Sequence, residues 1–152
     1  MRKPRFHVID RINAILETLK QTNKDKVFRL VTHLQNLNIS SDTVKFFQII
    51  QNIVSNAIKF TPEDGEIEIV LNEADDHYII SISDNGIGIP DHLKPFIFDR
   101  RTSAGRAGLR GDKSNGVGLS IIKRLVEIME GQIWFESTEN VGTTFYVKLP
   151  KE

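Results

Sequence analysis

The segment from Tyr78 to Pro90 limits the possible folds of this chain most strongly, because an apolar run leads directly into a glycine-containing turn. Residues 78–83 (YIISIS) have the composition of a buried strand. Residues 84–90 (DNGIGIP) follow at once, so the strand would hold the Asp84 carboxylate at the mouth of a pocket. The glycines would let the main chain approach a flat ligand, and the carboxylate can accept a hydrogen bond from an exocyclic amine such as that of adenine. Taken alone, the same pattern also fits an ordinary hairpin turn.

Length and charge fit a single compact domain. The chain has 152 residues, and Lys plus Arg equal Asp plus Glu at 20 each, so no overall basic field indicates a nucleic-acid partner. It has no cysteine, which excludes a disulfide framework and a thiolate zinc site and fits a cytoplasmic location. No apolar run approaches the length of a membrane span, so we expect no direct membrane contact by this domain.

The spacing of apolar residues predicts helices that alternate with strands. Helical spacing covers residues 8–22, a long stretch that Ser41 or Asp42 would cap and that ends near Phe60, a short stretch at 91–96, and 119–129. On the long helix, Val44, Phe47, Ile50, Ile53, Val54 and Ala57 are predicted to face inward. Predicted strands are 27–34, 66–72, 78–84, 132–137 and 143–149, with a short edge piece at 37–40.

The order of these elements predicts an α+β fold. The segments 66–72 and 78–84 alternate and are joined by a polar turn, which indicates an antiparallel hairpin, and 132–137 with 143–149 forms a second one. Residues 100–115 are rich in Gly, Arg and Ser and are predicted to be a mobile loop. The expected architecture is a helical layer on one face of a mixed sheet.

A second chemical feature is a line of amides on the long helix. Gln48, Asn52 and Asn56 follow one another at four-residue steps, and Lys59 lies four residues after Ser55, so these side chains share one side of the helix. Amide oxygens are suitable ligands for Mg²⁺, which takes its remaining oxygens from water and phosphate. Surface amides without a ligand are the alternative interpretation.

A third feature opens the helix predicted at 119–129. Residues 116–120 (GVGLS) would free backbone N–H groups to point at an anion, and the helix dipole favours a phosphate there. The segment is not a Walker A loop, because the Gly-Lys-Ser/Thr order is absent. It is not a dinucleotide fingerprint either, because no strand leads directly into it.

In their order and spacing, these segments resemble the ATP-binding catalytic domain of sensor histidine kinases, whose nucleotide fold is shared with DNA gyrase, MutL and a heat-shock chaperone. Residues 48–62 resemble the N box, 84–90 the G1 box, Phe98 the F box, 116–119 the G2 box and 142–145 a final glycine box. The resemblance covers residues 6–150 and leaves 1–5 as an N-terminal remnant and 151–152 as the end. It implies a two-layer Bergerat fold, a mostly antiparallel sheet of about five strands under about three helices. Residues from about 99 to 115 would form a flexible ATP lid.

The resemblance also implies roles for single residues. Asp84 would bind the adenine amine, Asn56 would bind Mg²⁺ with Asn52 in support, Lys59 would contact phosphate, and Phe60 would cover the base or ribose. The remaining expected ATP contacts are Gly86, Ile87, Gly88, Arg106, Arg110, Lys113, Gly116, Val117, Gly118, Leu119 and Thr144.

Some positions depart from the family pattern. Related sequences often carry a second aromatic residue where this chain has Arg101, and a glycine where it has Asn140. Asparagine tolerates the left-handed backbone conformation better than other non-glycine residues, so the second change is modest. The hydrolytic members of the superfamily use a glutamate one turn before the metal asparagine, and this chain has Asn52 there. An amide cannot remove a proton from water, so intrinsic hydrolysis should be slow.

In the kinases the nucleophile is a histidine on a two-helix dimerisation domain. None of the four histidines here has that context, since His7 lacks the acidic neighbour and the proline of the family motif. We therefore expect a monomeric domain that binds ATP and Mg²⁺, does not phosphorylate itself alone, and serves a dimerisation domain and a downstream response regulator. The alternatives are a serine kinase of the anti-sigma type and a nucleotide-binding module without catalysis.

Overall fold

The computed structural model describes residues 8–34, 43–99 and 117–151. The edge piece predicted at 37–40, the predicted caps Ser41 and Asp42, and the predicted lid from residue 100 onward lie outside these ranges. Among the described residues, no helix combines the length and apolar character that a membrane crossing requires.

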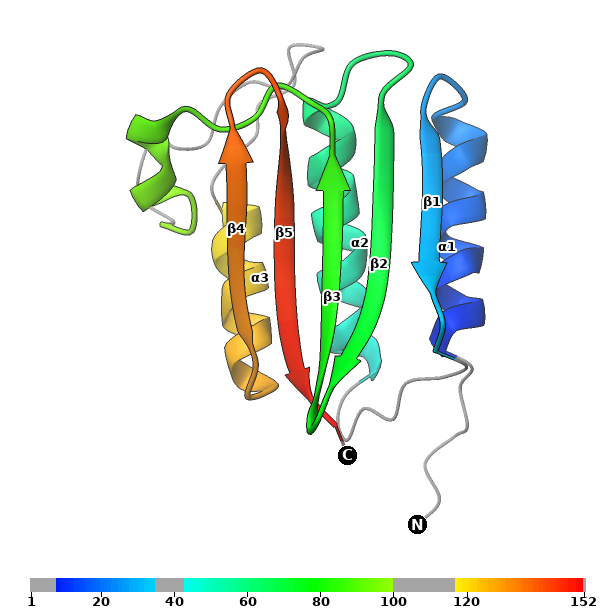
Figure 1. Ribbon diagram of the computed structural model, residues 1–152, viewed down its shortest axis with the longest axis vertical. Coiled ribbons are helices and arrows are strands. Elements are labelled where there is room, and N and C mark those ends of the chain that lie inside the picture. The colour runs from blue at the N-terminus through cyan, green and yellow to red at the C-terminus, as the bar shows by residue number, and fades with distance from the viewer. Residues whose placement is uncertain (1–7, 35–42, 100–116, 152) are drawn as a thin grey trace.

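Helices and strands alternate along the chain as predicted (Figure 1). The described elements are α1 (Val8–Thr22), β1 (Val27–Thr32), α2 (Thr43–Phe60), β2 (Glu66–Ala74), β3 (His77–Asp84), the 3₁₀ helix η1 (Asp91–Phe96), α3 (Val117–Ile128), β4 (Gln132–Thr138) and β5 (Gly142–Pro150). The largest differences in boundary are that β1 ends two residues earlier than predicted, and β2 and α3 each extend two residues beyond the predicted end or start.

The strands form one mixed sheet with the order β1-β2-β3-β5-β4. β1 lies parallel to β2, and all other neighbours are antiparallel, which confirms both predicted hairpins. β5 comes last in the sequence but lies between β3 and β4. As a result, the end of β3 has the start of β5 beside it, with Asp84 opposite Thr143.

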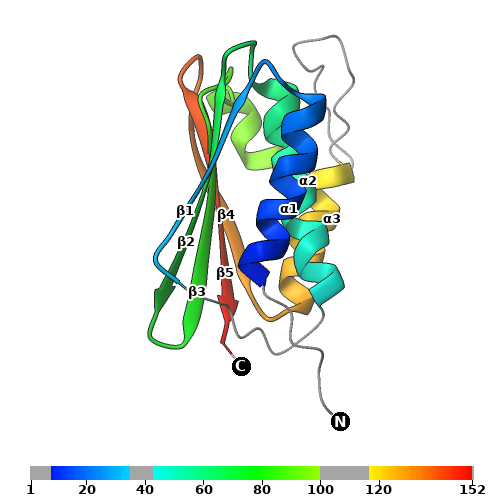
Figure 2. The same cartoon turned by 90° about the vertical axis from the view of Figure 1, so that its right-hand side faces the viewer.

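All three α-helices cover the same face of the sheet (Figure 2). Strand residues alternate accordingly, so that on β3 the side chains of Tyr78, Ile80 and Ile82 are buried beneath the helices. The opposite face carries Trp134, whose ring stacks on Tyr146 at 5.4 Å between centroids. The fold is therefore the predicted two-layer α+β sandwich.

One predicted core position is wrong. Val44 was expected to face inward, but it is 68% exposed. At about 100° per residue, Ile53 lies half a turn around the helix from Val44. Ile53 is fully buried, and together with Phe46 it defines the side of α2 that faces the sheet. Val44 consequently lies on the outer side of the helix.

Candidate functional site

The turn after β3 packs directly against the C-terminal end of α2. The backbone N–H of Ile87 donates a hydrogen bond to the carbonyl oxygen of Phe60 at 3.0 Å. A Cβ atom placed at Gly86 would lie only 2.1 Å from that same oxygen. Glycine is therefore required at this position for steric reasons, and two predicted site segments, 84–88 and the end of α2, are in contact.

Asp84 is positioned by its strand and by its own turn. It is half-buried and lies on the same side of β3 as Ile82, the side that faces the helices. Its Oδ1 atom accepts a hydrogen bond from the N–H of Gly86 at 2.9 Å. The neighbouring Asn85 attaches the turn to the sheet, because its Oδ1 accepts a hydrogen bond from the N–H of Glu66 at 2.8 Å. The carboxylate is thus held in a fixed direction at the end of the strand.

The start of β5 supplies a residue that the sequence interpretation missed. Thr143 pairs with Asp84 in the sheet register, is 7% exposed and lies on the helix-facing side. Thr144, the predicted contact, lies on the opposite side, where its Oγ1 is 2.9 Å from Ser83 Oγ. The structure therefore brings Thr143, and not Thr144, beside Asp84. Strand alternation would have shown this, since the buried Phe145 shares the side of Thr143.

The turn between β4 and β5 packs against the glycine segment, residues 86–88. Gly88 has φ +69°, and a Cβ there would lie 2.1 Å from the carbonyl oxygen of Thr138. The N–H of Asn140 donates to the carbonyl oxygen of Ile87 at 2.7 Å. Asn140 has φ +66°, in agreement with the expectation that asparagine can take the place of glycine there.

The amide side chains lie along α2, whose C-terminal end contacts the turn after β3. Asn56 is half-buried, whereas Asn52 and Lys59 are exposed, and Phe60 is buried. Within the described residues no group of three or more His, Cys, Asp or Glu side chains could hold a metal ion. One or two amide oxygens would nevertheless suffice for a Mg²⁺ ion that arrives with phosphate, because such an ion keeps most of its waters.

The second predicted phosphate element, α3, packs beside α2 in the helical layer. Gly118 lies in its first turn and is exposed, and a Cβ there would have no heavy atom of the described residues within 4 Å. Leu119 is buried, so its side chain belongs to the core. The other predicted contacts near this helix, Arg106, Arg110, Lys113 and Gly116, and the departure at Arg101 lie outside the described residues.

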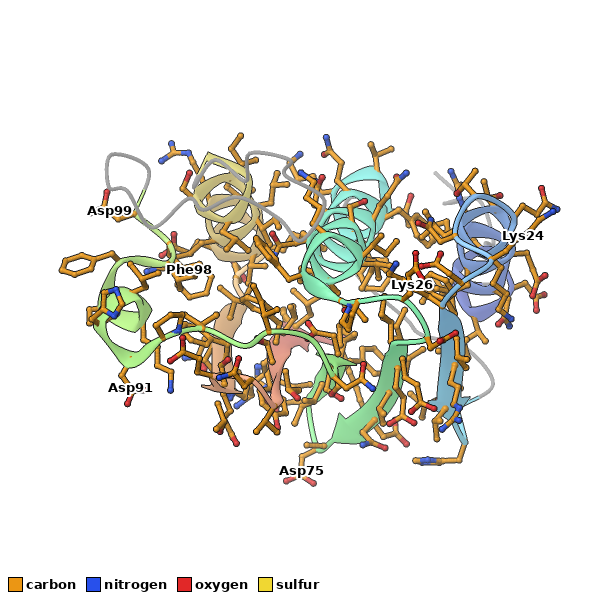
Figure 3. The ribbon with its side chains drawn as sticks, turned by 90° about the horizontal axis from the view of Figure 1, so that it is seen from above. Lys24, Lys26, Asp75, Asp91, Phe98 and Asp99 are labelled. Carbon is orange, nitrogen blue, oxygen red and sulfur yellow. The ribbon has the colours of Figure 1, made fainter. Side chains whose placement is uncertain are left out.

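Phe98 connects the segment after η1 to the core. Its ring lies 5.7 Å from that of Phe135 and 6.3 Å from that of Phe145, both edge-on, and Figure 3 shows it between η1 and the layers of α3 and β4. The ammonium group of Lys123, on α3, lies 5.7 Å from the ring centroid of Phe98. The residue predicted as the F box is thus packed against both layers next to residue 100, where the predicted lid would begin.

Lys94 attaches η1 to the same end of the sheet. Its Nζ donates to the carbonyl oxygen of Ser137 at 2.6 Å and lies 2.8 Å from Asp91 Oδ1. The hydrogen bond from Lys94 lowers the pKa of the Asp91 carboxyl below its usual range. Asp91 is exposed, so this pair orients the helix and contributes little energy.

The fold and the site together define a nucleotide-binding domain of the GHKL class: a one-sided mixed sheet, a strand-end carboxylate beside a glycine turn, and amides on the helix that the turn contacts. The chain belongs to the histidine kinase-, DNA gyrase B- and HSP90-like ATPase family, which matches residues 41–152.

Individual relatives agree with this assignment. The chain is 33% identical over 141 residues to the signal transduction histidine-protein kinase ArlS of Staphylococcus aureus, covering 93% of this chain and 31% of ArlS. The nucleotide-free catalytic domain of histidine kinase ThkA matches with a TM-score of 0.83 and 27% identity over 99% of both chains. ThkA in complex with the response regulator TrrA matches with a TM-score of 0.75 and 27% identity, over 95% of this chain and 40% of that one. These likenesses confirm the resemblance to sensor histidine kinase ATP-binding domains, and the chain spans about a third of ArlS.

Proposed function

We propose that this domain binds ATP with Mg²⁺ and supplies the γ-phosphoryl group to a histidine on a dimerisation domain outside this chain. The observation that carries the proposal is the fixed carboxylate of Asp84 beside a glycine turn that packs on α2. A carboxylate held in this way accepts a hydrogen bond from an adenine amine without having to be reoriented. The family and the likeness to ThkA and ArlS support the same assignment.

The phosphate end of the proposed site lies along α2 and the first turn of α3. Asn56 would bind the metal, Asn52 would support it, and Lys59 would offset phosphate charge. Thr143 would join Asp84 at the adenine end in place of the predicted Thr144, because it lies opposite Asp84 on the helix-facing side. A bound Mg²⁺ would offset charge on the β- and γ-phosphates.

The proposed site has no carboxylate at the position where the hydrolases of this superfamily have the general base that activates water. Asn52 is one helical turn before Asn56, where a hydrolase of this superfamily would need a carboxylate. The γ-phosphoryl group would therefore wait for an external nucleophile. We propose a response regulator as the next acceptor, supported by the complex of the similar histidine kinase ThkA with the response regulator TrrA.

The test is to incubate the domain with γ-labelled ATP and Mg²⁺, first alone and then with the separately produced dimerisation domain of the parent kinase. We expect no stable label on the domain alone, and an acid-labile phosphohistidine on the added domain. A variant of the added domain without its acceptor histidine is the control. Acid-stable phosphoserine on a partner would contradict the proposal in favour of an anti-sigma type of serine kinase, and label on a histidine of this chain would contradict the need for a partner.

A further inference from the structure

The hydroxyl group of Ser137, near the end of β4, has three hydrogen-bond partners from different segments. Its Oγ accepts from the N–H of Ile89 at 2.7 Å and donates to the carbonyl oxygen of Gly142 at 3.0 Å. The third partner is Thr143 Oγ1 at 2.8 Å. Ser137 thus connects the glycine segment after β3 with the start of β5, on the side of the sheet where Asp84 lies.

These partners fix the position of every hydroxyl hydrogen in the group. A serine hydroxyl has one hydrogen to donate and two lone pairs to accept with. The carbonyl of Gly142 can only accept, so it takes the hydrogen of Ser137, and the N–H of Ile89 occupies one lone pair. The bond between Ser137 and Thr143 must then use the hydrogen of Thr143. As a result, both lone pairs of Thr143 Oγ1 are left to accept hydrogen bonds.

Thr143 lies directly opposite Asp84 in the register of β3 and β5. Side chains at such paired positions have Cβ atoms about 4.5–5.5 Å apart, so the two groups face the same small volume. Both present only acceptors there: a carboxylate, and a hydroxyl whose hydrogen is engaged elsewhere. An exocyclic amine with two N–H groups matches this pair, whereas a carbonyl oxygen would meet two acceptors.

We propose that Ser137 is a positioning residue that makes the site selective for 6-amino over 6-oxo purine nucleotides. It acts through Thr143, by holding that hydroxyl in the direction in which it can only accept. The inference rests on the proposed nucleotide site and deepens it, since it assigns selectivity to a side chain one hydrogen bond away from the base. Without Ser137, the hydroxyl of Thr143 would rotate and could donate to a 6-oxo group.

The test compares the dissociation constants of ATP and inosine triphosphate, which carries a 6-oxo group, for the domain in the presence of Mg²⁺. The wild-type chain should prefer ATP. In Ser137→Ala the ratio of the two constants, inosine triphosphate over ATP, should fall about tenfold, the size of one hydrogen bond. Ser137→Thr retains a hydroxyl group and should restore the wild-type ratio.

A matched control lies on the other face of the sheet. Ser83 and Thr144 form the same kind of hydroxyl pair at 2.9 Å, one position along from Asp84 and Thr143. Ser83→Ala should therefore leave the ratio unchanged. A general destabilisation of the fold would weaken the binding of both nucleotides equally and would leave the ratio unchanged. The ratio therefore distinguishes a positioning effect of Ser137 from an effect on stability.

The outcomes are distinct from those that test the proposed function. If the wild-type domain binds ATP and the ratio in Ser137→Ala stays within twofold of wild type, this inference is overturned and the nucleotide site stands. If the wild-type domain binds no ATP, both are overturned. Should Ser137→Ala fail to fold, Thr143→Val removes the acceptor with little change in shape. Thr143→Val should then lower the ratio by raising the dissociation constant of ATP alone, and an unchanged ratio would overturn the inference.

Discussion

Asp84 is the residue on which the proposed adenine contact depends. Replacing it with asparagine keeps the shape but removes the charge, and one of the two acceptor positions becomes a donor that would face the amine. We expect Asp84→Asn to weaken ATP binding by on the order of 1.5–3 kcal/mol, roughly tenfold to a hundredfold. Titration calorimetry with an ATP analogue measures this directly.

Asp75→Asn is the control for Asp84→Asn. Asp75 is exposed in the turn between β2 and β3, at the end of the sheet away from the site. This variant should bind ATP like the wild-type chain. If Asp84→Asn also bound with unchanged affinity, the assignment of the pocket would be wrong.

At the residue scale, the local motifs allowed a prediction for Asp84 and Gly86, because a strand followed by a glycine turn is visible in consecutive residues. For Thr143, alternation along β5 predicts the side of the sheet but not the neighbour. Its neighbour Asp84 is reached across the sheet from a strand far along the chain, and a single shift along β5 exchanges the two faces. Ser137 was missed because its role depends on three hydrogen bonds between separate segments.

At the scale of elements, α3 offers a test of whether its first turn serves the ligand or the fold. A Cβ at Gly118 would have no described heavy atom within 4 Å, and alanine favours a helix more than glycine. Gly118→Ala should therefore raise the free energy of unfolding by up to about 1 kcal/mol. It should also weaken ATP binding if phosphate approaches the backbone there. Urea unfolding and nucleotide titration measure the two effects.

Gly88→Ala provides the opposite case. Gly88 has φ +69°, and the added Cβ would lie 2.1 Å from the carbonyl oxygen of Thr138. Because both the backbone strain and this clash disfavour the folded state, Gly88→Ala should lower the free energy of unfolding by about 1–3 kcal/mol or more.

A Gly118→Ala variant that is stable and binds ATP as tightly as the wild-type chain would contradict the proposed role of the start of α3.

Element boundaries followed from local patterns, whereas orientation needed the whole sheet. The two hairpins were predictable because their strands are joined by short turns. The parallel pairing of β1 with β2 was not, since α2 lies between them in the sequence. The prediction for Val44 was wrong because an apolar residue in the first turn of a helix also fits a core position. The burial of the larger Phe46 determines which side of α2 faces the sheet, and Val44 lies on the other side.

At the scale of the whole molecule, exposed ion pairs make the free energy of unfolding depend on pH in the acid range. Hydrogen bonds from Lys151, His77 and Lys94 lower the pKa of Glu73, Asp76 and Asp91, respectively. A carboxyl whose pKa is lower in the folded state stabilises that state above its unfolded pKa. This contribution is lost as the pH falls through the folded pKa. The free energy of unfolding should therefore decrease below about pH 4, and less steeply in 1 M salt.

Urea midpoints measured between about pH 5 and pH 3 check this dependence. Asp91→Asn removes one of the three carboxyl groups and should make the decrease shallower. The contribution should be small, because all three carboxyl groups are exposed. An equally steep decrease in Asp91→Asn would show that the Asp91–Lys94 pair does not contribute.

The position of β5 in the sheet also sets the order in which the protein can become competent during synthesis. Asp84 is synthesised before the strand beside it, because β5, which carries Thr143, follows all the other described strands in the sequence. Pairings between residues so far apart in sequence form slowly, because a long loop must close first. A nascent chain that lacks β5 would hold half of the adenine end and should not retain nucleotide. ATP binding would therefore report that β5 has joined the sheet.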